Sequence, residues 1–290
     1  MPLNSATITD LPPEQLMERC CRTPWETYLP PFQMAPGVFY VSGNDWVACY
    51  LIDTGDGLIL IDTAMHETCY LMLESIRELG YEPKDIRKIL LTHAHCDHIG
   101  AARTMKELTG ADVYLGEQDL FFLNERTDLI CNDNYTCGAF TVDEVYKDDK
   151  PICMGNIKIH TMSTPGHTPG CTSMFFDVTD QDGTVYTCGI HGGVGLNTMS
   201  KKYLLENGLP LSLQQEFCAG FRKLDQLHVD ICLPSHTNQV GIIPLIPKIT
   251  KEYNPFIDAN IWHQLMHERL GRMEEMMAEE ADRNGAFIIT

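Results

Sequence analysis

Four side chains that bind metals occur within six residues, in the segment Leu91-Thr-His-Ala-His-Cys-Asp-His-Ile-Gly100. An apolar run precedes them and a helical pattern follows, which predicts a strand-to-helix turn. Because alternate residues of an extended chain share a face, His93 and His95 can point at one metal ion. Asp97 and His98 lie where the chain turns and can reach a second ion. Imidazole nitrogens with a carboxylate oxygen suit zinc.

Two later segments carry histidines that would complete such a centre. His167 lies in the loop Ser163-Thr-Pro-Gly-His-Thr-Pro-Gly170, and His236 lies in Leu233-Pro-Ser-His-Thr237, after an apolar run. Each catalytic zinc takes about three protein ligands and keeps an open position, so these two histidines are the expected remaining ligands. A structural cluster and turn-capping histidines are the alternatives, but structural zinc sites are closed and usually rich in cysteine.

The elements around these segments alternate between strands and helices. β-Branched and aromatic runs separated by turn residues predict an antiparallel meander over 38–41, 46–52 and 58–61. Further strands are predicted over 86–91, 113–115, 152–163, 172–178, 184–190 and 229–233. Helical spacing of apolar residues predicts helices over 69–79, 99–109, 212–227 and 257–283. Two sheets packed face to face with helices outside, an α/β (α+β) fold, would satisfy this order.

The length of 290 residues fits one large domain, and the sequence shows no repeat or flexible linker. We expect a single domain over 1–290. The Pro-rich segment up to about residue 35 is expected to wrap the surface as an N-terminal extension, and the long helix over 257–283 is expected to end the domain.

Composition limits the partners of the chain. The net charge is −19, with 40 acidic against 21 basic residues, which argues against nucleic acids and anionic membrane surfaces as partners. No stretch approaches the ~18 apolar residues of a membrane-spanning helix. Residues 1–35 lack the features of a secretory signal, and 12 cysteines are too few for a disulfide scaffold. We expect free thiols, a cytoplasmic location and a small-molecule substrate.

The segments THAHCDHIG, TPGHTPGCTS and PSH resemble the metal motifs of the metallo-β-lactamase superfamily. The chain is most similar to the third subclass of metallo-β-lactamases, whose two zinc ions have His and Asp ligands; residues 24–64 and 254–258 also resemble that subclass. The resemblance implies an αββα sandwich with the site at one edge of the sheets. It implies one zinc ion bound by His93, His95 and His167, and a second bound by Asp97, His98 and His236.

The same resemblance implies a zinc-dependent hydrolase. A hydroxide bridging two zinc ions would attack the carbonyl of an amide or ester, and Asp97 would accept or relay a proton. A β-lactam is the first expected substrate. The lack of an export signal counts against a dedicated role in antibiotic resistance. Hydrolysis of a lactone or thioester is the alternative reaction, and a mononuclear iron dioxygenase of the same fold is the alternative of another class.

Three further residues are candidates for roles beside the metals. Asp62 closes the strand of the segment Leu58-Ile-Leu-Ile-Asp-Thr-Ala64. The resemblance to the superfamily implies that it orients a ligating histidine through a hydrogen bond, and capping a turn is the alternative. Cys188 stands in the strand where many relatives carry a bridging Asp, which weakens the lactone and thioester hypotheses. It would be a soft metal ligand or a buried thiol. His191 would donate a hydrogen bond to the substrate or would be an exposed loop histidine.

The walls of the substrate pocket are expected to come from loops. The segments 116–150 and 190–212 are the candidates because they follow the predicted site strands. Aromatic side chains in the first segment are candidate contacts, with ordinary packing as the alternative. These side chains are Phe121, Phe122, Tyr135 and Phe140.

Overall fold

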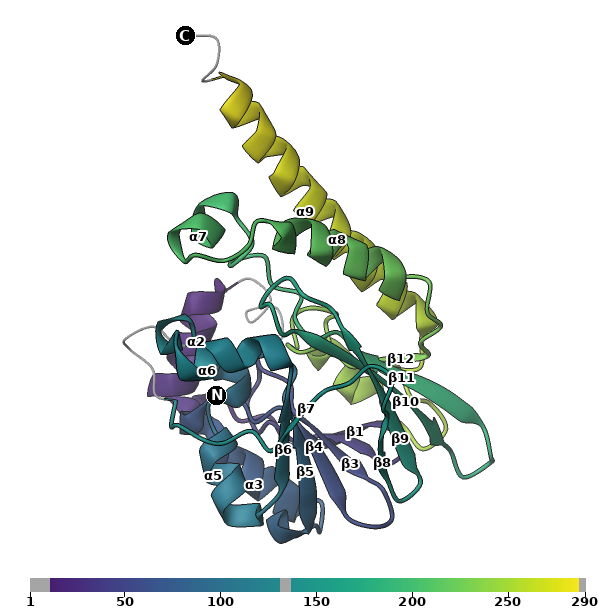
Figure 1. The fold of residues 1–290 in the computed structure, drawn as a ribbon. Helices are drawn as coiled ribbons and strands as arrows, with labels where there is room; N and C mark the ends of the chain where they lie inside the picture. Colours follow the sequence, from purple (N-terminus) through teal and green to yellow (C-terminus); the bar gives the residue numbers. More distant parts are fainter. Residues whose placement is uncertain (1–10, 131–136, 287–290) are drawn as a thin grey trace.

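The computed structural model describes residues 11–130 and 137–286, and Figure 1 shows two sheets stacked between helices. The first sheet has the strand order β1-β2-β3-β4-β5-β6-β7. The meander β2-β3-β4 is antiparallel, whereas β4, β5, β6 and β7 are mutually parallel neighbours. The strands are β1 (Phe32–Ala35), β2 (Val38–Tyr40), β3 (Tyr50–Asp53), β4 (Leu58–Ile61), β5 (Ile86–Leu90), β6 (Asp112–Leu115) and β7 (Glu144–Val145).

The second sheet has the order β12-β11-β10-β9-β8. Its strands are antiparallel neighbours except for β11 and β12, which run parallel. They are β8 (Ile152–Met154), β9 (Ile157–Ser163), β10 (Thr172–Thr179), β11 (Val185–Ile190) and β12 (Ile231–Cys232).

Alternation along the strands divides the core into layers. On β4, Leu58 and Leu60 belong to one buried cluster while Ile59 and Ile61 belong to another. Successive side chains of a strand point to opposite faces, so a strand that is buried throughout contacts a layer on each side. The cluster with Ile59 and Ile61 also contains residues of the second sheet, such as Phe176, and therefore lies between the sheets.

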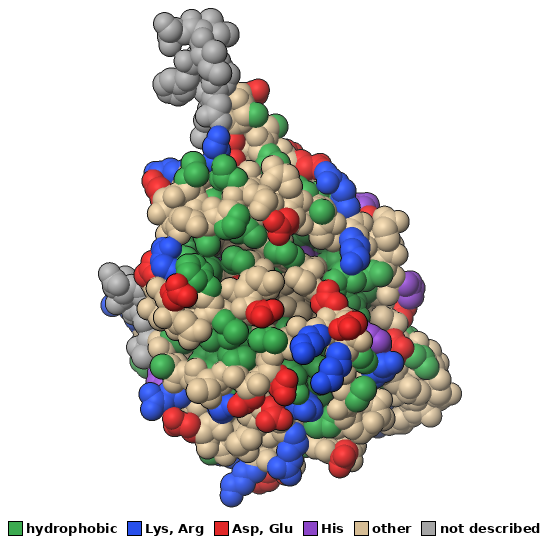
Figure 2. All heavy atoms as spheres, in the orientation of Figure 1, with side chains coloured by type: hydrophobic (Ala, Val, Ile, Leu, Met, Phe, Trp, Pro, Cys, Tyr) green, Lys and Arg blue, Asp and Glu red, His purple; other side chains and the backbone are tan. Residues whose placement is uncertain are grey.

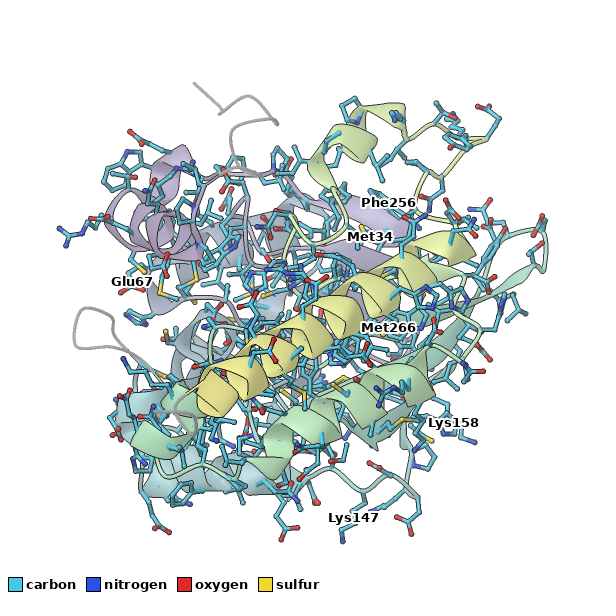
Figure 3. The ribbon with its side chains drawn as sticks, turned by 90° about the horizontal axis from the view of Figure 1, so that it is seen from above. Met34, Glu67, Lys147, Lys158, Phe256 and Met266 are labelled. Atoms are coloured by element: carbon cyan, nitrogen blue, oxygen red, sulfur yellow. The ribbon has the colours of Figure 1, made fainter. Side chains whose placement is uncertain are left out.

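Helices cover the outer faces of both sheets (Figure 1). Those on the first sheet include α3 and α5, and those on the second are α8 and α9, which lie side by side in Figure 3. Phe175 of β10 contacts Trp262 of α9 edge to face, with ring centroids 5.6 Å apart. The α-helices are α2 (Pro13–Arg22), α3 (Cys69–Glu78), α4 (Cys96–Ile99), α5 (Ala102–Thr109), α6 (Leu120–Asn124), α7 (Lys201–Glu206), α8 (Ser212–Leu224) and α9 (Ala259–Ala286).

Short 3₁₀ turns join several of these elements. They are η1 (Pro24–Glu26), η2 (His66–Thr68), η3 (Pro83–Asp85), η4 (Glu117–Asp119), η5 (Thr127–Leu129) and η6 (Ile243–Lys248).

Among the described residues, no helix combines the length and apolar character needed to cross a membrane. Acidic and basic side chains are interspersed on the face shown in Figure 2.

The predicted layer architecture is confirmed, but the elements differ from the prediction in several places, and β7, α6 and α7 were not predicted. The N-terminal segment forms helix α2 and edge strand β1. Strand β3 begins only at Tyr50, because the backbone of Val47 pairs with His236 instead. The predicted strand over 152–163 is two strands. Gly155 turns the chain between them with φ +52°, and a Cβ there would lie 1.9 Å from the carbonyl oxygen of Thr54.

Candidate metal centre

Six side chains that could bind metal ions meet at one edge of the sandwich, from four segments. The loop after β5 carries His93 and His95, and the short helix α4 that follows carries Asp97 and His98. The loop between β9 and β10 contributes His167, and the segment after β12 contributes His236. The structure therefore brings together the residues that the sequence predicted to be metal ligands.

The first group comprises His93, His95 and His167. Nitrogen atoms of these three side chains lie within 4.8 Å of one another. Nδ1 of His95 is 2.9 Å from Nε2 of His167. Nε2 of His93 is buried and has no hydrogen-bond partner among the described residues. The three rings thus point their nitrogens at a common centre.

The second group comprises Asp97, His98 and His236. Nε2 of His98 lies 3.3 Å from Nε2 of His236. Oδ2 of Asp97 lies 3.6 Å from Nε2 of His98 and 3.5 Å from Nε2 of His236. His93 is close to this group as well, because its donor atom lies within 4.8 Å of those of Asp97 and His98. The two groups therefore adjoin each other.

Hydrogen bonds behind the first group fix which nitrogen carries the proton in two of its three rings. The hydroxyl of Thr92 donates to Oδ2 of Asp62 (2.8 Å), so the Thr92 hydroxyl oxygen must accept from Nδ1 of His93, 3.1 Å away. Thr198 donates to the carbonyl oxygen of His167 (2.8 Å) and must accept from its Nδ1 (3.1 Å). Both rings therefore present an unprotonated Nε2 to the centre.

Asp62 fixes a third ring. Its Oδ2 lies 2.8 Å from Nδ1 of His98, which directs Nε2 of that ring toward Asp97 and His236. Asp62 also accepts the backbone N–H of Thr92 at 2.8 Å, is fully buried, and has a φ of 58°. A positive φ is uncommon outside glycine, and such positions concentrate at functional sites. The sequence predicted that Asp62 orients a ligating histidine, and its contact with His98 is the contact that this role requires.

The electrostatics of the site favour the neutral form of four of its five imidazoles. Burial lowers the pKa of His93 and His167, and neighbouring histidines lower it further. Burial also lowers the pKa of His95 and His236 to about 3. His98 differs: burial acts to lower its pKa, but the carboxylates of Asp97 and Asp62 outweigh that effect and raise it.

Asp119 connects the two loops of the first group, and no local pattern in the sequence indicates it. Its Oδ2 accepts the backbone N–H of Ala94 (2.8 Å) and the hydroxyl of Thr168 (2.7 Å), and its Oδ1 accepts the N–H of Gly170 (2.6 Å). Ala94 lies between His93 and His95, and Thr168 follows His167. The buried carboxylate therefore sets the distance between these loops.

Backbone pairing holds the His236 segment in place. Ala48 donates its N–H to the carbonyl oxygen of Ser235 (2.9 Å), and Thr237 donates its own to Trp46 (2.8 Å). The indole of Trp46 also lies against the ring of His236, with centroids 4.8 Å apart. Residues 46–49 were predicted to extend a strand, but they form the support for this histidine.

The donor set fits metal ions better than it fits a hydrogen-bonded cluster. Facing imidazole nitrogens that lack protons cannot satisfy each other, and a buried nitrogen without a partner costs about 1–3 kcal/mol. Among the described residues, His93 Nε2 is such a nitrogen. Neutral imidazoles and a carboxylate with oriented tautomers are the ligands that zinc takes in catalytic sites.

A cavity of about 550 Å³ opens onto these side chains. This volume is in the range of sites that hold small molecules. Helix α2 borders it through Pro13 and Met17, and the loop after β11 borders it through residues 193–195. The cavity is therefore closed in part by the N-terminal segment, which the sequence predicted only to wrap the surface.

A family model for the metallo-beta-lactamase superfamily matches residues 45–189, half of the chain. The chain belongs to the metallo-beta-lactamase superfamily. The match includes five of the six clustered side chains and ends before His236.

Solved structures of metallo-beta-lactamases are similar over nearly the whole chain. BJP-1 of Bradyrhizobium japonicum, a subclass B3 enzyme, is 27% identical with a TM-score of 0.80 over 89% of this chain and 97% of its own. FEZ-1 of Legionella gormanii is 27% identical with a TM-score of 0.79 over 88% of this chain and 98% of its own. The predicted fold and the resemblance to the third subclass are confirmed.

Curated relatives match a shorter region. YobT of Bacillus subtilis is 30% identical over 163 residues, which are 53% of this chain and 67% of that protein. An N-acyl homoserine lactonase of a Bacillus species is 26% identical over 166 residues, 48% of this chain and 61% of its own. The chain thus spans less than two thirds of the lactonase.

Two predicted site residues lie away from the cavity of this metallo-beta-lactamase fold. His191 is 3% exposed, stacks on Phe221 with ring centroids 4.3 Å apart, and is not among the cavity-lining residues. The expectation of an exposed loop histidine is therefore wrong, and His191 has no direct path to substrate. Cys188 is fully buried in the cluster between the sheets, which matches the expected buried thiol.

The predicted pocket loops are right in part. The first segment contributes residues 128–130, and the second contributes 193–195, Asn197, Thr198, Tyr203 and Asn207. The aromatic candidates do not line the cavity among the described residues. Phe122 packs in the core, Phe121 is 40% exposed, and Phe140 borders a separate hollow near α5. Tyr135 lies outside the described residues.

Proposed function

We propose that this metallo-beta-lactamase-fold protein is a dinuclear zinc hydrolase that cleaves the amide or ester bond of a small molecule. The observation that carries the proposal is the double cluster of metal-binding side chains, with unprotonated nitrogens directed inward, at the base of a cavity. His93, His95 and His167 would hold one ion, and Asp97, His98 and His236 the other. Similarity to the subclass B3 structures makes a β-lactam the first substrate to test.

When bound, zinc supplies a water molecule that ionises near neutral pH and a Lewis acid for the carbonyl oxygen. The chain's own side chains position and shield this chemistry. Thr92, Thr198 and Asp62 keep three imidazoles in the ligating tautomer. Residues of α2 and α9 line the cavity and reduce the access of bulk water.

Asp97 is the candidate for handling the proton of the attacking water. Its carboxylate is 8% exposed and borders the cavity, so it can reach both His236 and a bound substrate. A carboxylate at that place can accept a proton and pass it to a leaving nitrogen or oxygen. No side chain of the proposed site needs to form a covalent intermediate.

Hydrolysis of a lactone is the second candidate. The sequence match to an N-acyl homoserine lactonase favours it. The strand β11 gives an argument against it, because Cys188 is buried between the sheets and no carboxylate of that strand lies among the clustered side chains.

The test is an assay of the full chain, purified without chelator, against a chromogenic cephalosporin, an N-acyl homoserine lactone and a thioester. Hydrolysis of at least one substrate should stop with chelator and return with zinc. His93→Ala should abolish it, whereas His160→Ala, which removes an exposed histidine of β9, should not. Unchanged hydrolysis in His93→Ala, or none by the zinc-loaded chain, would count against the proposal.

A further inference from the structure

Helix α9 carries an arginine in the row of residues that faces the core. Trp262, Met266 and Met273 are each at most 1% exposed, and Arg269 falls between them at helical spacing. Its side chain is only 15% exposed. Figure 3 shows α9 crossing the molecule beside α8, with Met266 labelled on the N-terminal part of α9. Helical spacing alone would predict an apolar residue at this position.

The arginine has little to neutralise it. Its Nε has no hydrogen-bond partner among the described residues. Its ion pair is long, because Nε lies 3.7 Å from Oε2 of Glu268. The side chain of Glu268 is 47% exposed and also accepts a hydrogen bond from Arg272 at 3.3 Å. A buried charge without a close partner destabilises the fold. Packing therefore does not explain the choice of arginine over leucine or methionine.

Arg269 lines the same cavity as the clustered histidines. Among the described residues that line the cavity, it is the only lysine or arginine. The cavity carboxylate of Asp128 already has a partner, Arg126, at 2.8 Å.

We propose that Arg269 binds a carboxylate group of the substrate in the cavity that the clustered histidines also line. This inference rests on the proposed function and specifies its substrate class: an amide or ester that also carries a carboxylate. A planar guanidinium can hold a carboxylate through two parallel hydrogen bonds, which fixes the orientation of the rest of the molecule. The substrate then supplies the negative charge that the fold does not.

An NMR titration tests the proposal without turnover. It measures the binding of phenylacetate and of its neutral analogue phenylacetamide to the zinc-loaded full chain. The native chain should prefer phenylacetate. Arg269→Met should weaken phenylacetate binding roughly 10- to 100-fold and leave phenylacetamide unchanged, since a hydrogen-bonded charge pair is lost. Arg269→Lys should retain part of the preference, because it keeps the charge and loses the fork geometry. Arg103→Met, at an exposed arginine outside the cavity, is the matched control.

Thermal unfolding separates this role from a structural one. Arg269→Met should raise the Tm by about 2–4 °C, because methionine suits the apolar row of α9. A structural arginine predicts the opposite: a lower Tm and equal loss of both probes. That result would overturn the proposal, as would a native chain without preference for phenylacetate. Phenylacetate binding that Arg269→Met leaves unchanged would assign the probe to the metal ions and would also overturn it.

The kinetic version distinguishes this inference from the proposed function. For a hydrolysed substrate, Arg269→Met should raise KM for the free acid and not for its methyl ester. Hydrolysis without such a difference would retain the hydrolase and reject Arg269 as the carboxylate site. Selective binding of phenylacetate by a chain that hydrolyses none of the substrates would retain Arg269 as the carboxylate site and reject the hydrolase.

Discussion

Substitution of Asp62 tests how the scaffold orients the metal-binding side chains. Its carboxylate accepts three hydrogen bonds of 2.8 Å each: two from Thr92 and one from His98. In Asp62→Asn one oxygen becomes a donor group. The amide should keep its oxygen toward His98 and the Thr92 hydroxyl, since this orientation loses one bond instead of two. The backbone N–H of Thr92 then lacks an acceptor, which costs about 1–3 kcal/mol.

Asp62→Ala removes both acceptor oxygens, which accept three hydrogen bonds, and leaves at least two buried donors unsatisfied, so the free energy of unfolding should fall by roughly 2–6 kcal/mol. His98 then loses the contact that fixes its tautomer, and zinc affinity should fall about 10- to 100-fold. Asp62→Asn should lie between the native chain and Asp62→Ala in both quantities.

Denaturant unfolding gives the stability, and competition with a chromophoric chelator gives the zinc affinity. Asp149→Ala, at an exposed carboxylate, is the control and should change neither. The reasoning would be refuted if Asp62→Ala bound zinc as tightly as the native chain, or if the two Asp62 variants were equally stable.

Three further changes test other parts of the account. Burial raises the pKa of Asp119 from 3.8 to about 6, although its hydrogen bonds oppose the shift. The stability from the protonated form should be present below about pH 4 and lost as the pH rises through 6, by about 3 kcal/mol at most. The buried histidines titrate in both chains, so the free energy of unfolding of the native chain relative to Asp119→Asn should fall by this amount between pH 4 and 8. Gly116→Ala places a Cβ 2.0 Å from the carbonyl oxygen of Gly170, so calorimetry should show a lower Tm and chelator competition should show a weaker zinc affinity. In Gly271→Ala the added Cβ meets nothing within 4 Å, so this substitution should instead stabilise α9 by about 0.5–1 kcal/mol. Among the described cysteines, exposed Cys153 should react first with an alkylating reagent, as followed by mass spectrometry, because burial raises the pKa of thiols such as Cys171 and Cys188. Early labelling of Cys171 would contradict the packing around the His167 loop.

The clustering of the candidate metal ligands was predictable because much of its information is local. Four candidate ligands lie within six residues, and a strand followed by a helix sets their directions. His167 lies in a segment whose prolines and glycines mark a rigid loop, and His236 follows a buried strand. Alternating and helical patterns likewise indicated the two layers of strands and the long C-terminal helix.

The features that the sequence did not reveal depend on contacts between distant segments. Asp119 lies 49 residues from the hydroxyl of Thr168 that it binds, and nothing near it marks the role. Arg269 stands out only once α9 is placed over the cavity. Residues 46–49 have the composition of a strand, but tertiary pairing with the His236 segment overrides this preference.

Helix α2 and strand β1 were missed for a different reason. Each is short, and the prolines around them suggested an irregular segment. Leu16 and Cys20 nevertheless form a buried face on α2, and β1 pairs antiparallel with β2. Short elements of this kind gain their stability from the surface they cover, which single-sequence patterns do not reveal.

Metal content tests the central claim most directly. Elemental analysis of the full chain, purified without chelator and dialysed against zinc, should give two zinc ions per chain. His93→Ala and His236→Ala should each lower that number, and His160→Ala should not. A single iron ion per chain, or a zinc content that the His93 and His236 substitutions leave unchanged, would contradict the dinuclear zinc centre.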